Sequence, residues 1–284
     1  LPPKTTIFFL MESSRLNMLN GHFKPQETYN ARSIQAPSDD DVVLVSMART
    51  AMTRSKKGPQ KDTAPEAMLA PVLKDVLVKA NNLDGKHVQE ICIGNVLQPG
   101  AGSTTSRMGQ FLAGIPYTTP LIGINRLCSS GLQAVATVAN QIKSGEIDCG
   151  IGGGVESMSM FSMMGQVNPE AISDLVYDHP EANKCLMPMG LTSENVAEKY
   201  GITRQQQDQM AYESHMKAVY CQKMGWSKDE ITPYETIIKD KEGNEKKVMV
   251  TMDDGLRPQT TLAGLAKLKP AFKKGGTTTA GNAS

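Results

Sequence analysis

The sequence predicts an α/β protein whose first part is a layered domain around a mostly buried sheet. Short apolar runs alternate with segments of helical periodicity up to Glu156. This alternation is typical of a sheet covered by helices. A chain of 284 residues is also long enough to bury a proper core.

The elements of this domain are expected in the following order. The first apolar run, residues 41–47, predicts a strand. A capping box with a proline in the first turn, at residues 63–66, then starts a helix. A second strand is expected at 91–97 and a short helix at 107–113. The helix after residue 66 has one apolar face, made of Leu69, Val72, Leu73, Val76 and Leu77.

A cysteine follows the next predicted strand, residues 120–126. From Ser129 onward the apolar residues have helical spacing, and Gly145 is expected to end that helix. Cys128 therefore lies at a helix N-terminus, where unpaired N–H groups and the dipole favour a thiolate. This geometry fits an acyl-accepting nucleophile. It fits a small buried hydrophobic residue equally well, and the two readings stay open at this point.

Composition excludes several classes of function. The formal net charge of +1 and the charged fraction of 21% do not indicate a nucleic-acid surface. No apolar run approaches the roughly 20 residues that span a bilayer. The cysteines are odd in number and lack CxxC spacing, which argues against disulfides and a zinc site. They are Cys92, Cys128, Cys149, Cys185 and Cys221.

The second part of the chain has a different character. Residues 160–165 are rich in methionine, and loose surface packing and an acyl-chain contact are both open readings. Thr203 and the residues after it cap a long helix, and residues 231–238 and 247–252 predict a hairpin. The inner face of the long helix is expected to contain Met210, Ala211, Ser214, Ala218 and Cys221.

The triple glycine at residues 152–154 could suggest a phosphate-binding loop. It lacks the Lys-Ser/Thr ending of a P-loop and the full GxGxxG fingerprint. Close backbone packing beneath Cys128 is the better interpretation.

Several motifs agree in order and spacing with one family. They are NRLCSSGLQAV at 125–135, GGGVESMS at 152–159, MGLTSENVA at 189–197 and TAGNAS at 279–284. In these motifs the chain resembles the thiolase family, with the closest similarity to its peroxisomal 3-ketoacyl-CoA members. The resemblance runs from about Val42 to the last residue.

The resemblance implies a thiolase-like layered α/β/α domain with an inserted loop domain. Residues 1–40 would be a leader and 41–159 the N-terminal thiolase domain. Residues 160–256 would be the inserted loop domain, which holds coenzyme A, and 257–284 would return toward the N-terminal domain. The second, C-terminal domain of a thiolase is expected to be missing from this chain.

The resemblance also implies the chemistry. Cys128 would be the acyl-thioester nucleophile in thiolytic cleavage of a 3-ketoacyl-CoA, with coenzyme A as co-substrate, no permanently bound cofactor and no metal. A homodimer is implied as well. Arg257 matches the family's arginine near the nucleotide end of coenzyme A, and Ser284 matches the serine that meets the pantetheine arm. Met189 and Ala280 match apolar positions of the pantetheine channel more loosely.

The family's activating histidine, on a Gly-His-Pro loop, and its second cysteine, on a Cys-x-Gly loop, have no counterpart in the sequence. We therefore expect a truncated thiolase that performs little or no thiolysis alone. The alternative is a half-length, non-catalytic protein that associates with or regulates a full thiolase. Alternative enzymes are an acetoacetyl-CoA thiolase and a ketoacyl synthase.

The N-terminal part of the sequence contains a pattern that resembles a targeting signal. The chain begins with Leu1, and Met11 is the expected translation start. The spacing of Arg15 and Leu16 from His22 and Phe23 resembles the second type of peroxisomal targeting signal. Such signals are read by an import receptor and lie outside the fold. The expected location is the peroxisome, with the mitochondrion and the cytosol as alternatives.

Overall fold

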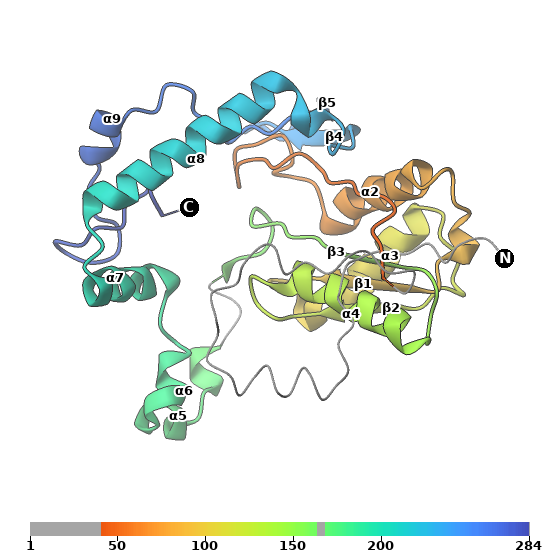
Figure 1. Cartoon of the computed structure of the whole chain (residues 1–284), viewed down its shortest axis with the longest axis horizontal. Coiled ribbons are helices and arrows are strands. Elements are labelled where there is room, and N and C mark those ends of the chain that lie inside the picture. The colour runs from red at the N-terminus through yellow and green to blue at the C-terminus, as the bar shows by residue number, and fades with distance from the viewer. Residues whose placement is uncertain (1–40, 164–167, 284) are drawn as a thin grey trace. The chain divides into compact units, whose positions relative to one another are not determined.

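The computed structural model describes residues 41–163 and 168–283. Backbone contacts divide them into two compact units, whose elements are labelled in Figure 1. Unit 1 comprises residues 41–51, 55–163 and 232–251. Unit 2 comprises residues 52–54, 168–231 and 252–283.

Unit 1 contains a three-stranded parallel sheet of order β2-β1-β3. The central strand is β1 (Glu90–Gly94), flanked by β2 (Leu121–Ile124) and β3 (Gly150–Gly154). Ile91 of β1 is in register with Leu121 on one side and Ile151 on the other. The predicted strands at 91–97 and 120–126 are confirmed with narrower bounds.

Two helices lie against one face of this sheet. α2 (Pro65–Lys79) packs on α3 (Ser103–Leu112). Leu73 of α2 shares a buried cluster with Ile91 and Ile93 of β1. Short 3-10 helices at Gly85–His87 and Pro99–Gly102 lie in the connections.

The opposite face of the sheet carries α4 (Ser130–Ser144), as Figure 1 shows. Cys92 of β1 packs there with Ala134 and Val138. Because successive strand residues point to opposite faces, Cys92 and its neighbours Ile91 and Ile93 belong to different layers. The predicted α/β/α layering is confirmed.

The apolar run at residues 41–47 is not a strand, so that prediction is wrong. Leu44 is partly buried and Val45 exposed, as in a half-buried strand. However, within the described ranges no strand of either sheet pairs with this run. Instead, it lines a cavity of about 1180 Å³ together with α2 and β3, and Ser46 Oγ donates to the Val76 carbonyl at 2.8 Å. Apolar alternation locates a buried face, but a strand also needs a hydrogen-bonding neighbour.

Unit 2 is mainly helical. Its longest helix, α8 (Arg204–Met224), is preceded by the predicted Thr203 cap, and the complete capping box with Gln206 is confirmed. The expected inner face is only partly correct, because Ala211 is buried but Met210 is 75% exposed. The helices are α5 (Asp174–Asp178), α6 (Pro180–Lys184), α7 (Met189–Tyr200), α8 (Arg204–Met224) and α9 (Leu262–Ala266), with 3-10 helices at Pro169–Ala171 and Trp226–Lys228.

The predicted hairpin is confirmed as antiparallel β4 (Tyr234–Lys239) and β5 (Glu245–Val250). It belongs to unit 1, which differs from the sequence-based division, where it lay in the inserted domain. Hydrogen bonds explain the difference, since Gln60 Nε2 donates to the Tyr234 hydroxyl at 2.8 Å and the Lys239 N–H to Asp62 at 2.8 Å. Residues 257–283 group with unit 2 rather than with the N-terminal domain.

Candidate active site at the Cys128 turn and residues 277–282

Cys128 lies in the turn between β2 and α4, two residues before the helix begins. Its thiol is free and the residue is exposed, so the reading as a buried packing residue is wrong. At the other end of α4, Gly145 adopts a φ of 78° and caps the helix, as predicted. The turn therefore presents a sulfur atom near the N-terminal end of a 15-residue helix, where backbone N–H groups favour negative charge.

Short side chains hold this turn in shape. The Leu127 N–H donates to Asn125 Oδ1 at 2.9 Å. Ser130 Oγ accepts from the Arg126 N–H at 2.9 Å and donates to the Leu127 carbonyl at 2.5 Å. These bonds support a left-handed backbone at Leu127, whose φ is 51°. Hydrogen bonds of the residues before and after Cys128 thus fix the backbone position of the nucleophile candidate.

Glycines allow α4 to approach the sheet closely beneath Cys128. A Cβ at Gly94 of β1 would lie 2.4 Å from the Ser130 carbonyl carbon. A Cβ at Gly152 of β3 would lie 2.6 Å from Val135 Cα. Real Cβ atoms do not approach backbone so closely, so the predicted role of the triple glycine in close packing is confirmed at Gly152.

A polar cluster at the same edge of the sheet was missed by sequence reasoning. Asn95, 1% exposed, follows β1 and donates to the Val155 carbonyl at 2.6 Å and to Glu156 Oε1 at 3.1 Å. The Val96 N–H donates to Glu156 Oε2 at 2.9 Å, and Asn125 Nδ2 donates to the Val96 carbonyl at 3.2 Å. These bonds join the carboxyl ends of all three strands, the edge where parallel sheets bind ligands.

The remaining cysteines differ from Cys128 in their surroundings. Burial, and then the Glu90 charge, raises the pKa of Cys92 to about 11. Burial, and then Asp148, also raises the pKa of Cys149. Both changes disfavour the reactive thiolate. Cys185 is exposed like Cys128, but it follows the five-residue helix α6. Across residues 41–163 and 168–283, no cluster of three His, Cys, Asp or Glu side chains could hold a metal ion.

The predicted coenzyme A residues that the structure describes belong to unit 2, whereas Cys128 belongs to unit 1. Met189 is the first residue of α7 and 63% exposed, and Arg257 and Ala280 are exposed. Ser284 lies outside the described residues, as do the four residues of the targeting-like pattern, which are Arg15, Leu16, His22 and Phe23.

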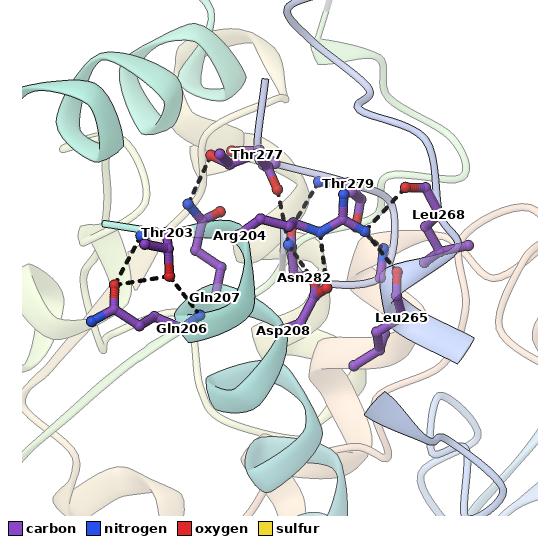
Figure 2. Close-up of polar contacts among 12 residues, drawn as sticks. Thr203, Arg204, Gln206, Gln207, Asp208, Leu265, Leu268, Thr277, Thr279 and Asn282 are labelled. Atoms are coloured by element: carbon purple, nitrogen blue, oxygen red, sulfur yellow. Dashed lines mark hydrogen bonds and ion pairs between the residues drawn. The ribbon is translucent and has the colours of Figure 1, made fainter. Parts of the chain in front are cut away.

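A network of hydrogen bonds surrounds the segment that carries Ala280, residues 277–282 (Figure 2). Asn282 donates to Asp208 Oδ1 at 2.8 Å and to the Thr277 carbonyl at 3.1 Å, and it accepts from the Thr279 N–H at 2.7 Å. Arg204 Nε donates to Asp208 Oδ2 at 2.9 Å. The motif TAGNAS marked this segment, but its partners on α8 were not predicted.

The carboxylate of Glu194 on α7 binds the same segment. It accepts from the Thr277 N–H at 2.9 Å and from the Thr278 N–H at 2.8 Å. Burial by itself would raise its pKa, but the hydrogen bonds from Thr277 and Thr278 outweigh burial and lower the pKa. The carboxylate is 4% exposed and stays charged at neutral pH.

Comparisons with known proteins agree with the motifs. Residues 42–284 match the family described as thiolase, N-terminal domain. The peroxisomal 3-ketoacyl-CoA thiolase of Homo sapiens is 46% identical over 278 residues, which are 95% of this chain and 65% of that protein. The peroxisomal 3-ketoacyl-CoA thiolase 2 of Arabidopsis thaliana is 51% identical over 249 residues, 86% of this chain and 53% of that protein.

Solved structures show the same similarity. The dimeric peroxisomal thiolase of Saccharomyces cerevisiae superposes with a TM-score of 0.75 at 39% identity, covering 87% of this chain and 62% of that one. The acetyl-CoA acetyltransferase of Bacillus anthracis gives a TM-score of 0.69 at 31% identity, covering 84% and 60%. The chain thus spans about 65% or less of the length of these proteins.

Proposed function

Because the chain belongs to the thiolase family, we propose that it carries the nucleophile and the coenzyme A segment of an acyltransferase acting on 3-ketoacyl-CoA. The observation that supports this most directly is the exposed Cys128 thiol, presented on a braced turn before α4. The names of the similar peroxisomal 3-ketoacyl-CoA thiolases support the substrate class.

The reaction proceeds in two half-reactions. The Cys128 thiolate attacks the 3-keto carbon and forms an S–C bond. The bond between C2 and C3 then breaks, its electron pair goes to C2, and the proton that the Cys128 thiol lost on ionising is supplied to C2 by way of solvent, which releases acetyl-CoA. A second coenzyme A thiol attacks the acyl-cysteine, takes the acyl group and returns a proton to Cys128. Donors that stabilise the enolate oxygen are required in the first half-reaction.

Location and assembly follow from the same similarity. We propose a peroxisomal protein that an import receptor recognises through Arg15, Leu16, His22 and Phe23, and that forms a homodimer. The names of the curated relatives support the location, and the dimeric state of the similar yeast thiolase supports the assembly. Among the residues that the structure describes, none of the helices is both long and apolar enough to cross a bilayer.

The first half-reaction provides the test. The full chain is incubated with excess acetoacetyl-CoA, and its cysteine peptides are analysed by mass spectrometry. Because the family's activating histidine and second cysteine have no counterpart in the sequence, we expect slow acetylation, limited to one acetyl group on Cys128, and little or no sustained thiolysis. Cys185→Ser, which removes another exposed thiol, should still be acetylated, and Cys128→Ser should not. Acetylation spread over several cysteines, or its persistence in Cys128→Ser, would contradict the proposal.

A further inference from the structure

The three threonines at residues 277–279 form a buried support below an exposed alanine. Thr278 and Thr279 are 3% and 0% exposed, whereas the next residue, Ala280, is exposed. Buried backbone and hydroxyl groups need hydrogen-bond partners. Thr277 and Thr278 bond to side chains of two helices. The Thr278 carbonyl also accepts from the Ala271 N–H, and Thr279 bonds within the segment, to Gly281 and Asn282.

The first partner is Glu194 of α7. Besides the two threonine N–H groups, its Oε2 accepts from Thr277 Oγ1 at 3.1 Å. The residue before it, Ser193, shares a hydrogen bond with Thr278, with 3.0 Å between the two hydroxyl oxygens. The start of the segment is therefore bonded to α7 through both its backbone and its side chains.

The second partner is the Asp208 and Asn282 pair (Figure 2). Asp208 of α8 is 4% exposed, and its two oxygens bind Arg204 and Asn282 separately. Gln207, the residue before Asp208, donates to Thr277 Oγ1 at 2.8 Å. The end of the segment is therefore bonded to α8.

Arg204 connects this pair to helix α9 and the residues that follow it. Besides Asp208, it donates to the Leu265 carbonyl at 2.6 Å and to the Leu268 carbonyl at 3.0 Å. The same two leucines pack against Gly281, where a Cβ would lie 2.4 Å from Leu268 Cδ1. The backbone on both sides of Ala280 is thus fixed, while Ala280 itself is exposed.

We infer that Glu194 and Asp208 are positioning residues for coenzyme A, because they hold residues 277–282 so that Ala280 meets the pantetheine arm. This inference rests on the proposed function, in which residues 277–282 form the coenzyme A segment, and on the resemblance, which matches Ala280 to that arm. Neither carboxylate touches the ligand in this role. A surface that is already ordered binds without the entropic cost of ordering it, so its loss lowers affinity.

The expected effect is selective for one end of the ligand. Coenzyme A contains a nucleotide part, assigned to Arg257, and a pantetheine arm, assigned to Ala280. Disturbing the segment should weaken binding of coenzyme A but not of adenosine 3′,5′-bisphosphate, which lacks the arm. General destabilisation of unit 2 would weaken both.

The Asn282 pair allows a rescue experiment. Asn282→Asp places a second carboxylate 2.8 Å from Asp208 and removes the amide donor. Combining it with Asp208→Asn exchanges the donor and the acceptor and restores the bond between residues 208 and 282, whereas the bond from residue 282 to the Thr277 carbonyl stays lost. For Glu194→Gln the matched control is Glu198→Gln, one turn along α7, whose carboxylate binds Lys273 at 2.6 Å and is exposed.

Dissociation constants of both ligands are measured by calorimetry on the full chain, with Trp226 fluorescence as a check of folding. We expect Asn282→Asp and Glu194→Gln to weaken coenzyme A about 10-fold and the bisphosphate less than about 2-fold. The exchange variant should recover part of the coenzyme A affinity, because it restores one of the two bonds of the Asn282 amide, and Glu198→Gln should keep the affinity of the unaltered chain.

The outcomes separate this inference from the function on which it rests. If the unaltered chain binds coenzyme A and the variants bind it equally well, or lose both ligands together, the positioning role is wrong and the proposed function stands. If the unaltered chain does not bind coenzyme A, the assignment of the segment fails as well. Acetylation of Cys128 then still tests the nucleophile on its own.

Discussion

Leu127 adopts a left-handed backbone, with a φ of 51°, immediately before the nucleophile candidate. Its side chain is 64% exposed, so packing does not compensate for this conformation. A left-handed φ is unfavourable for leucine because its Cβ crowds the following carbonyl. The strain is offset by the bonds from Asn125 and Ser130, which close the turn. The position of the Cys128 sulfur therefore has a measurable energetic cost.

We predict that Leu127→Asn stabilises the chain, because asparagine tolerates the left-handed region better than leucine. The free energy of unfolding in urea should rise by about 0.5–1 kcal/mol. Leu132→Asn is the matched control, since Leu132 is 71% exposed but lies within α4. There asparagine is a poorer helix former, and stability should fall slightly. Equal effects at both positions would show that the backbone of Leu127 is not strained.

At the scale of residues, the sequence predicted Cys128 as the nucleophile candidate but did not predict which side chains surround it. Cys128 could be identified because a strand, a turn and a helix follow one another within 25 residues of chain, from β2 to the end of α4. Asn95 and Glu156 could not, because they meet only when β1 and β3 pair. Asp208 could not be identified either, because one of its two partners, Asn282, is distant in the sequence.

At the scale of elements, the contact between α4 and β3 depends on glycines of β3, where an added Cβ would meet α4 at Gly150 and most closely at Gly152. We predict that Gly152→Ala lowers the free energy of unfolding by about 1–3 kcal/mol, because the added methyl group would overlap the Val135 backbone. Gly153→Ala is the control, since no atom lies within 4 Å of the added carbon. It should change stability by less than about 0.5 kcal/mol. Urea unfolding followed by circular dichroism measures both, and a similar loss for the two variants would exclude the steric explanation.

Most elements whose signals are local were predicted well. The capping box at residues 63–66 is wrong, however, because Ala64 is the N-cap of α2 and the Thr63 hydroxyl lies 2.6 Å from that of Thr236 instead. Features that depend on a distant partner were predicted less well. The Thr203 capping box and the Gly145 stop need only neighbouring residues. The run at 41–47 has the right apolar pattern for a strand but no partner strand among the described residues. Met210 is an apolar residue on the exposed side of α8, and periodicity alone could not show which side faces the core.

At the scale of the whole molecule, the two compact units can be observed separately. The chain contains one tryptophan, Trp226, which belongs to unit 2 and makes an edge-to-face contact with Tyr220 at 5.5 Å between ring centroids. Its fluorescence therefore reports the packing of unit 2. Circular dichroism reports both units, because each contains helices. A difference between the two signals would identify the less stable unit.

Acid should weaken unit 2 through Glu194. The pKa of this carboxyl is lower in the folded chain than its ordinary value of 4.5, because bonds from Thr277 and Thr278 outweigh the opposing effect of burial. A lowered pKa means that the stabilisation is complete above the unfolded value and is lost as the pH falls through the folded pKa.

We therefore predict how the urea midpoint of unfolding, followed by Trp226 fluorescence, depends on pH. Near neutral pH Glu194 stays charged and its contribution to the midpoint is constant. Below about pH 4.5 Glu194 becomes protonated and the midpoint falls. Glu194→Gln should start from a lower midpoint and show a flatter decline. Glu198→Gln, whose carboxylate is exposed, should follow the unaltered chain more closely. If Glu194→Gln kept the full acid dependence, the loss would have to come from other carboxyl groups.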